Sequence, residues 1–202
     1  SKGGWGYTDN IALKQEDTSV TGWMIQALCA ARTAGVEVKP EPFAKALNFL
    51  DQVTDAHTGN VIYGFPSKQI TASYIPVVLM LRQHLGQSST DPVVRKLAFR
   101  TLADAPKVRL DWGKGWHEKG SESDKERERA FDPLRWYYAS YGMFYSGGAE
   151  WETWNKAMVT ALLELQDNNG SWQGSDIWTV KAGAAYSTAL CILTLQVYYR
   201  NH

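Results

Sequence analysis

The chain has 202 residues, of which 44% are hydrophobic and 21% are charged, a composition that excludes an intrinsically disordered protein. Lys and Arg together number 21, as do Asp and Glu, so the net charge is zero and a nucleic-acid partner, which needs a basic surplus, is not expected. The sequence has no apolar run of the roughly 18 residues that a transmembrane helix requires.

A glycine-aromatic cluster recurs along the chain at nearly equal intervals. The clusters begin at or near Gly3, Gly59, Gly115 and Gly170, so that the steps between them are 56, 56 and 55 residues. A fixed period of this size indicates an array of one supersecondary unit.

Apolar residues at helical spacing predict three helices in the first half of the chain. The first covers residues 18–34, with Gly35 at its end. The second begins near Pro42, and the third runs from about Thr71 to His84. Pro76 lies inside the third helix and therefore requires a kink or a later start. The apolar face of the first helix comprises Val20, Trp23, Met24, Ala27, Leu28 and Ala31.

Four more helices are predicted in the second half. The fourth opens at residues 90–92, and the fifth opens with Asp132 as N-cap and Pro133 in its first turn. The sixth covers residues 150–167 and the seventh residues 184–200. No segment shows the sustained two-residue alternation of a half-buried strand, so the protein is predicted to be all-α.

The seven helices fall into two classes. The first, third, fifth and seventh are apolar nearly all round, whereas the second, fourth and sixth are amphipathic, which predicts an inner and an outer layer. The first cluster has no helix before it, so the chain resembles the C-terminal part of a longer array. We expect a second copy or an upstream segment to cover the apolar flank of the first helix. The mixed-charge segment 119–130 is predicted to be a solvated loop insertion, or alternatively a partner-binding element.

The last cluster carries the residues of a known motif. Gln166, Gly170 and Trp172 have the spacing of the QW motif, and in this the chain resembles the squalene cyclases and, more loosely, the repeats of protein prenyltransferases and squalene-oxidase repeat proteins. The other clusters match only in part. The resemblance to this terpenoid cyclase and prenyltransferase superfamily implies a single domain over residues 1–202, folded as an α/α toroid or partial toroid. It also implies that the glutamine caps an outer helix and that the tryptophan stacks on it.

The same resemblance assigns candidate catalytic residues. Class II cyclases carry a D-x-D-D-T-A motif, whose nearest match here is Lys14 to Ser19. Glu16 then takes the place of the acid and Asp17 that of a charge stabiliser, as in a terpene cyclase-like isomerase or lyase. The alternative interpretation is that Asp17 is simply an N-cap, as Asp132 and Ser187 are expected to be in other units.

Aromatic residues in the inner helices are the candidate ligand-binding set. In a toroid they surround a central cavity, where they would bind an isoprenoid or another apolar ligand; the alternative is that they fill space between helices. A non-catalytic module that binds a protein or a polysaccharide is the rival function. The candidates are Trp23, Tyr74, Trp136, Tyr137, Tyr138, Tyr141 and Tyr186.

The sequence predicts neither a metal site nor a cofactor. No histidine is close in sequence to Cys29 or Cys191, which are expected to be buried thiols. The tryptophans of the turns are predicted to be structural staples: Trp5, Trp112, Trp116, Trp172 and Trp178.

Overall fold

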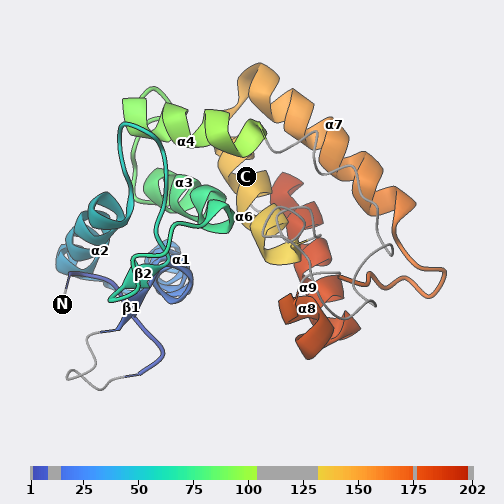
Figure 1. Ribbon diagram of the computed structural model, residues 1–202, viewed down its shortest axis with the longest axis horizontal. Helices are drawn as coiled ribbons and strands as arrows, with labels where there is room; N and C mark the ends of the chain where they lie inside the picture. The colour runs from blue at the N-terminus through green and yellow to red at the C-terminus, as the bar shows by residue number, and fades with distance from the viewer. Residues whose placement is uncertain (1, 9–14, 104–131, 175–176, 200–202) are drawn as a thin grey trace. The chain divides into compact units, whose positions relative to one another are not determined.

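The computed structural model describes residues 2–8, 15–103, 132–174 and 177–199 (Figure 1). Over these residues the protein is all-α, as predicted: it contains eight α-helices and one sheet of two very short strands. The chain divides into two compact units, residues 1–100 and 101–202. None of the helices in the described ranges is long and apolar enough to cross a membrane. The predicted loop at 119–130 lies outside the described residues, as do Trp112 and Trp116 of the third cluster.

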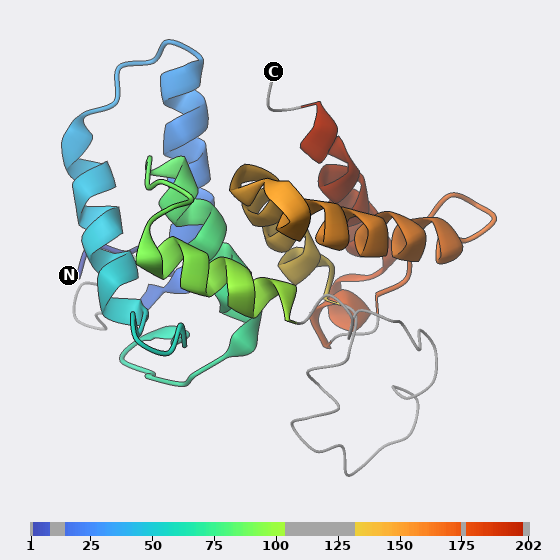
Figure 2. The same ribbon diagram turned by 90° about the horizontal axis from the view of Figure 1, so that it is seen from above.

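The first unit is built on three helices that pack on one another (Figure 2). α1 contacts both α2 and α3, and α2 also contacts α3. A fourth helix, α4, begins in this unit and ends just beyond its last residue. The bounds are Thr18–Thr33 for α1, Pro40–Val53 for α2, Ile75–His84 for α3 and Pro92–Leu102 for α4.

Local sequence signals set where these helices begin. Asp17 is the N-cap of α1, and the carboxylate of Asp91 accepts hydrogen bonds from the first backbone amides of α4. Pro76 stands in the first turn of α3, after the 3-10 turn η2 (Ala72–Tyr74), so the helix starts late instead of kinking. α2 begins at Pro40, slightly before the predicted start at Pro42.

A two-stranded antiparallel sheet, which the sequence analysis did not predict, ties the start of α1 to the second cluster. β1 (Glu16–Asp17) pairs with β2 (Gly64–Phe65), with Asp17 opposite Gly64. Two-residue strands are too short to show an alternating pattern, which explains why the sequence conceals them. Gly64 has φ of +151°, and a Cβ there would lie 2.1 Å from the Glu16 carbonyl oxygen, so only glycine fits.

The second unit is centred on α6. It packs on both α7 and α9, while the short α8 packs on α9. α8 was not predicted, because six residues are too few to show a helical period. The bounds are Pro133–Ser146 for α6, Gly148–Glu164 for α7, Ile177–Ala182 for α8 and Ala184–Leu195 for α9, which continues as the 3-10 turn η4 (Gln196–Tyr198).

The predicted caps of this unit are right in one case and wrong in the other. Asp132 caps α6, where its carboxylate accepts from the Arg135 amide. Ser187 is not an N-cap, because α9 already begins after Gly183, and the Ser187 hydroxyl donates instead to the carbonyl of Trp172. The serine therefore ties the turn to the helix.

The expectation that inner helices are buried on every side holds for α3 and α6 but not for α1 and α9. In α3 every residue from Ile75 to Arg82 is buried, and in α6 the run 136–143 is buried. α1 instead buries a narrow face of small and polar residues against its neighbours, while Trp23 and Met24 are 43% and 37% exposed. The residues of the predicted apolar face of this helix are thus all exposed or half-buried. The buried residues of α1 are Thr18, Ser19, Thr21, Gly22, Ile25 and Cys29.

Candidate functional site

The first and fourth clusters attach to the following inner helix through the same hydrogen bonds. The Trp5 amide donates to the Thr21 hydroxyl over 2.9 Å, and the Trp172 amide donates to the Thr188 hydroxyl over 3.0 Å. In both cases the threonine follows the tryptophan by 16 residues, and its hydroxyl also donates to the tryptophan carbonyl. The spacing that suggested a repeat therefore has a matching structural repeat.

The second and fourth clusters also bind the end of the outer helix before them. The Trp172 indole Nε1 donates to the Leu162 carbonyl in the last turn of α7 over 2.8 Å, and the Ile62 amide donates to the Val53 carbonyl at the end of α2 over 2.9 Å. These bonds satisfy carbonyls that a helix C-terminus leaves open. Trp172 is thus a staple, as predicted.

The geometry of Gln166 differs from the role that the family resemblance implied. Its side-chain amide donates to the Gly170 carbonyl within the turn, over 3.0 Å, and not to a carbonyl of α7. The glutamine therefore closes the turn, and the indole of Trp172 caps the helix.

Glu16 anchors the N-terminal segment. Its carboxylate is buried, with Oε1 accepting from the Lys2 amide at 2.6 Å and Oε2 accepting from the Gly4 amide at 3.1 Å. Backbone amides therefore occupy both oxygens of this side chain. The geometry therefore describes a structural anchor, and a role for Glu16 as a proton donor stays a prediction.

Asp17 is the N-cap of α1, as the alternative interpretation expected, and a catalytic role for it stays a prediction. Its Oδ1 accepts from the Ser19 amide at 2.7 Å and from the Val20 amide at 3.0 Å. Asp17 is fully buried, and its Oδ2 has no hydrogen-bond partner among the described residues. The second carboxyl oxygen is therefore the one part of this side chain that the cap does not use.

Tyr63 lies beside the Asp17 carboxyl, and Tyr74 lies beside Tyr63. Burial, together with the nearby Asp17 carboxylate, raises the pKa of Tyr63. The ring of Tyr74 is 5.5 Å from that of Tyr63. Two predicted site residues of the first unit, Asp17 and Tyr74, therefore lie close to the same residue, Tyr63. Tyr63 was absent from the predicted set, although its place in the second glycine cluster was a signal.

The four aromatic candidates in α6 are part of the core of the second unit. Trp136, Tyr137, Tyr138 and Tyr141 are all buried, and the ring of Tyr137 lies 5.1 Å from each of the other two tyrosines. Trp136 packs edge-on against Trp154 at 6.5 Å. Their positions agree with the packing interpretation.

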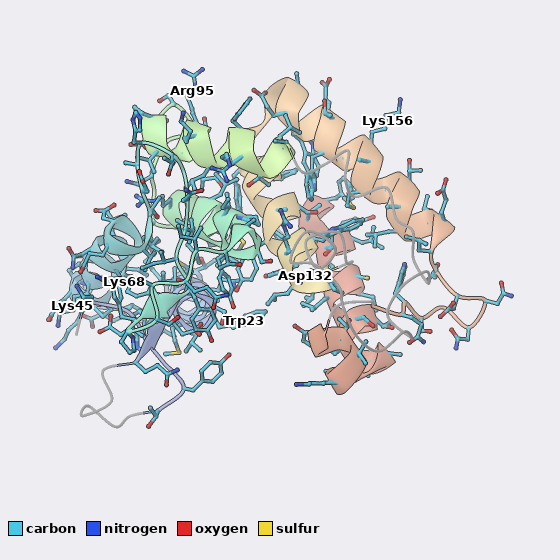
Figure 3. The ribbon with its side chains drawn as sticks, viewed as in Figure 1. Trp23, Lys45, Lys68, Arg95, Asp132 and Lys156 are labelled. Atoms are coloured by element: carbon cyan, nitrogen blue, oxygen red, sulfur yellow. The ribbon has the colours of Figure 1, made fainter. Side chains whose placement is uncertain are left out.

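The remaining two candidates are more accessible. Tyr186 is half-buried near the start of α9, and Trp23 is the more exposed of the two. Figure 3 shows Trp23 extending from α1 on the side away from Lys45 of α2.

Trp23 belongs to a continuous apolar surface, which we call the α1 face. Its members follow the i, i+3, i+4, i+7 spacing of one helix side and are exposed or half-buried. Arg32, near the end of α1, is the only charged residue of the helix. Isolated exposed apolar residues are common, but a contiguous stripe of them marks an interaction surface. The α1 face comprises Val20, Trp23, Met24, Ala27 and Ala31.

The two thiols are free and buried, as predicted. Burial raises the pKa of Cys191 to about 12, and burial also raises the pKa of Cys29. Within the described ranges no group of three His, Cys, Asp or Glu side chains could hold a metal ion.

Comparison with known proteins finds no family model, no curated protein and no solved structure that matches this chain. The likeness to the terpenoid cyclases therefore rests on the sequence motif alone.

Proposed function

We propose that this chain is a non-catalytic helical-repeat module that binds a protein partner along the α1 face. The observation that carries the proposal is the orientation of α1, which buries Ile25 and Cys29 together with small polar residues and exposes the larger Trp23 and Met24. Exposing such residues along three turns is unfavourable in water, at roughly 25 cal/mol per Å² of apolar surface, and a partner that covers them recovers this free energy. Aromatic and methionine side chains are also enriched at protein interfaces.

The positions of the acidic candidates favour binding over catalysis. Glu16 uses both carboxylate oxygens to hold the N-terminal segment, and Asp17 uses Oδ1 to cap α1. A general acid needs a proton to give and a path to its substrate. Anchoring the N-terminal segment and capping α1 require neither a transferable proton nor a path to a substrate.

A second candidate function is the binding of an isoprenoid or another elongated apolar molecule on the same face. It is favoured by the indole of Trp23, since an aromatic ring on an uncharged surface offers packing area to a hydrocarbon chain. The sequence resemblance to terpenoid cyclases points to the same ligand class. A cyclase-like isomerase or lyase would in addition require Glu16 and Asp17 to act on that ligand.

Native mass spectrometry of the purified chain separates these candidates. We expect a protein mass bound to the chain that Trp23→Lys removes and that Ile70→Lys retains, because Ile70 is an equally apolar, 62% exposed residue outside the α1 face. A small apolar molecule lost in the Trp23→Lys variant would instead establish the second candidate. A chain that carries neither would contradict the proposal.

A further inference from the structure

The turn after α7 contains the acceptor sequence of N-linked glycosylation. Asn169, Gly170 and Ser171 match its pattern, which is an asparagine, any residue except proline, and then a serine or threonine. The full sequence contains this pattern once, so no other asparagine competes with Asn169. A pattern of three residues also arises by chance, and the argument for a modification site therefore depends on how the turn presents the asparagine.

Asn169 is accessible on the surface of the second unit. The residue is exposed, as are its neighbours Asn168 and Gly170. Figures 1 and 2 show the orange turn projecting beyond the end of α7, away from α6 and α9 of the same unit. A carbohydrate attached to this turn would extend into water and would not displace the core of the unit.

The side chain of Asn169 is held by its oxygen and not by its nitrogen. Its Oδ1 accepts from the Ser171 amide at 3.0 Å and from the Ser171 hydroxyl at 2.8 Å, as in an Asx turn. Its Nδ2, on the other branch of the planar amide, donates no hydrogen bond to any residue that the structure describes. The nitrogen that receives a sugar is therefore free, while the serine hydroxyl of the acceptor pattern lies against the same side chain.

The main chain of the turn disfavours the competing reaction of this asparagine. In an Asn-Gly pair the backbone nitrogen of the glycine can attack the side-chain amide carbon, which leads to hydrolysis of the amide. Here the Gly170 amide donates to the Asp167 carbonyl over 2.8 Å, and the Asp167 amide donates to the Ser171 carbonyl over 2.8 Å. Attack by the Gly170 nitrogen would first have to break the bond to Asp167, so the turn protects the side-chain amide.

We propose that Asn169 is an acceptor for N-linked glycosylation, with a lipid-linked oligosaccharyl diphosphate as the donor. The Asn169 Nδ2 forms a bond to the anomeric carbon of the first sugar. The bond from that carbon to the diphosphate oxygen breaks, and the diphosphate leaves on its lipid. The proton that Nδ2 loses passes to a basic group of the transferase. This modification is independent of the α1 face and goes beyond the proposed function.

The cysteines are compatible with the oxidising compartments in which such a transfer takes place. Cys29 and Cys191 are both free and buried. Burial raises the pKa of both thiols, so little of the reactive thiolate forms at neutral pH. Neither thiol therefore needs a reducing environment to remain free.

Incubation of the intact, folded chain with a single-subunit oligosaccharyltransferase and a lipid-linked oligosaccharide tests the proposal. We expect the mass of the chain to increase by one oligosaccharide, which a glycan-releasing amidase removes. Asn169→Gln and Ser171→Ala should abolish the increase. Two matched controls should keep it: Ser171→Thr retains the hydroxyl, and Asn168→Gln changes the neighbouring exposed asparagine.

Four outcomes would overturn the proposal. A chain that gains no oligosaccharide would do so, as would one that still gains it after Asn169→Gln. Hydrolysis of the Asn169 amide in place of sugar transfer would show that the turn does not protect this side chain. Loss of transfer in Asn168→Gln as well as in Ser171→Ala would show that the shape of the turn, and not the acceptor pattern, is what the transferase requires. None of these outcomes bears on the α1 face, which the Trp23→Lys variant tests separately.

Discussion

α1 and α3 belong to the same unit and were both predicted to be inner helices, yet α1 exposes an apolar side whereas α3 is buried along most of its length. α3 is buried from Ile75 to Arg82 because α1 and α2, the helices that precede it in the chain, pack against it. α1 contacts only helices that follow it, and its apolar stripe around Trp23 is exposed. The difference teaches that an apolar composition does not by itself bury a helix on every side, since α9 is also partly exposed although α6 and α8 pack on it.

Truncating one apolar side chain in each helix should show the largest difference between them. Leu79→Ala in α3 removes a fully buried side chain and should lower the free energy of unfolding by about 3 kcal/mol, through lost burial and the cavity left behind. Met24→Ala in α1 removes a partly exposed side chain and should cost less than about 1 kcal/mol. Urea unfolding followed by circular dichroism measures both, and equal losses would mean that the α1 face is covered in solution.

The starts of the two helices should also respond differently to the loss of a side-chain cap. Asp17→Ala removes the cap of α1 and should cost about 1 kcal/mol, whereas Asp17→Asn should cost a few tenths because asparagine caps equally well. Thr71→Ala, before the turn that leads into α3, is the matched control, since Thr71 makes no side-chain cap bond. Thermal unfolding of the three variants gives the values. A large loss in Asp17→Asn would show that the carboxylate charge, and not the cap, is what the fold needs.

The smallest expected effect is a pH dependence that arises from a histidine in α3 and has no counterpart in the last turn of α1. Burial lowers the pKa of His84, in the last turn of α3, below its ordinary value near 6.5. The unfolded chain then binds the proton more tightly, so stability is complete above about pH 6.5 and declines as the pH falls below that value. The last turn of α1 contains no histidine. Unfolding measured between pH 7.5 and 5 should show the decline in the native chain and a flatter profile in His84→Gln; parallel profiles would contradict the assignment.

The sequence predicts the helices of this protein well wherever a local signal marks them. Asp17, Asp91 and Asp132 cap helices because a short acidic side chain satisfies the first amides of the next turn, an interaction within three residues. β1 and α8 were missed because neither is long enough to show a period. The sequence analysis expected an open apolar flank on α1 but not which residues form it, because an apolar stripe shows which residues share a side and not what lies opposite it.

The candidate site was less predictable, because its contacts join residues far apart in the chain. Glu16 was singled out by its resemblance to an acid motif, but its partners are the amides of Lys2 and Gly4, which no local pattern connects to it. Tyr63 reaches Asp17 only through the pairing of β1 with β2. In α6 the aromatic residues are numerous enough to suggest a cavity, and only their mutual distances show that Tyr137 and Tyr138 fill the core.

The small sheet has a consequence for how the array folds. Arrays of repeats usually gain stability one neighbour at a time, and folding can begin in any of them. Here β1, at the start of the first repeat, finds its backbone partner in the turn that opens the second. The first repeat cannot complete its main-chain pairing alone, because β1 pairs with β2 of the second repeat. Closing the loop between β1 and β2 has an entropic cost, which slows the formation of this pairing. The smallest fragment of this half that keeps its native pairing therefore extends from the N-terminal turn through Phe65, and a shorter piece should exchange its amide protons as an unfolded chain does.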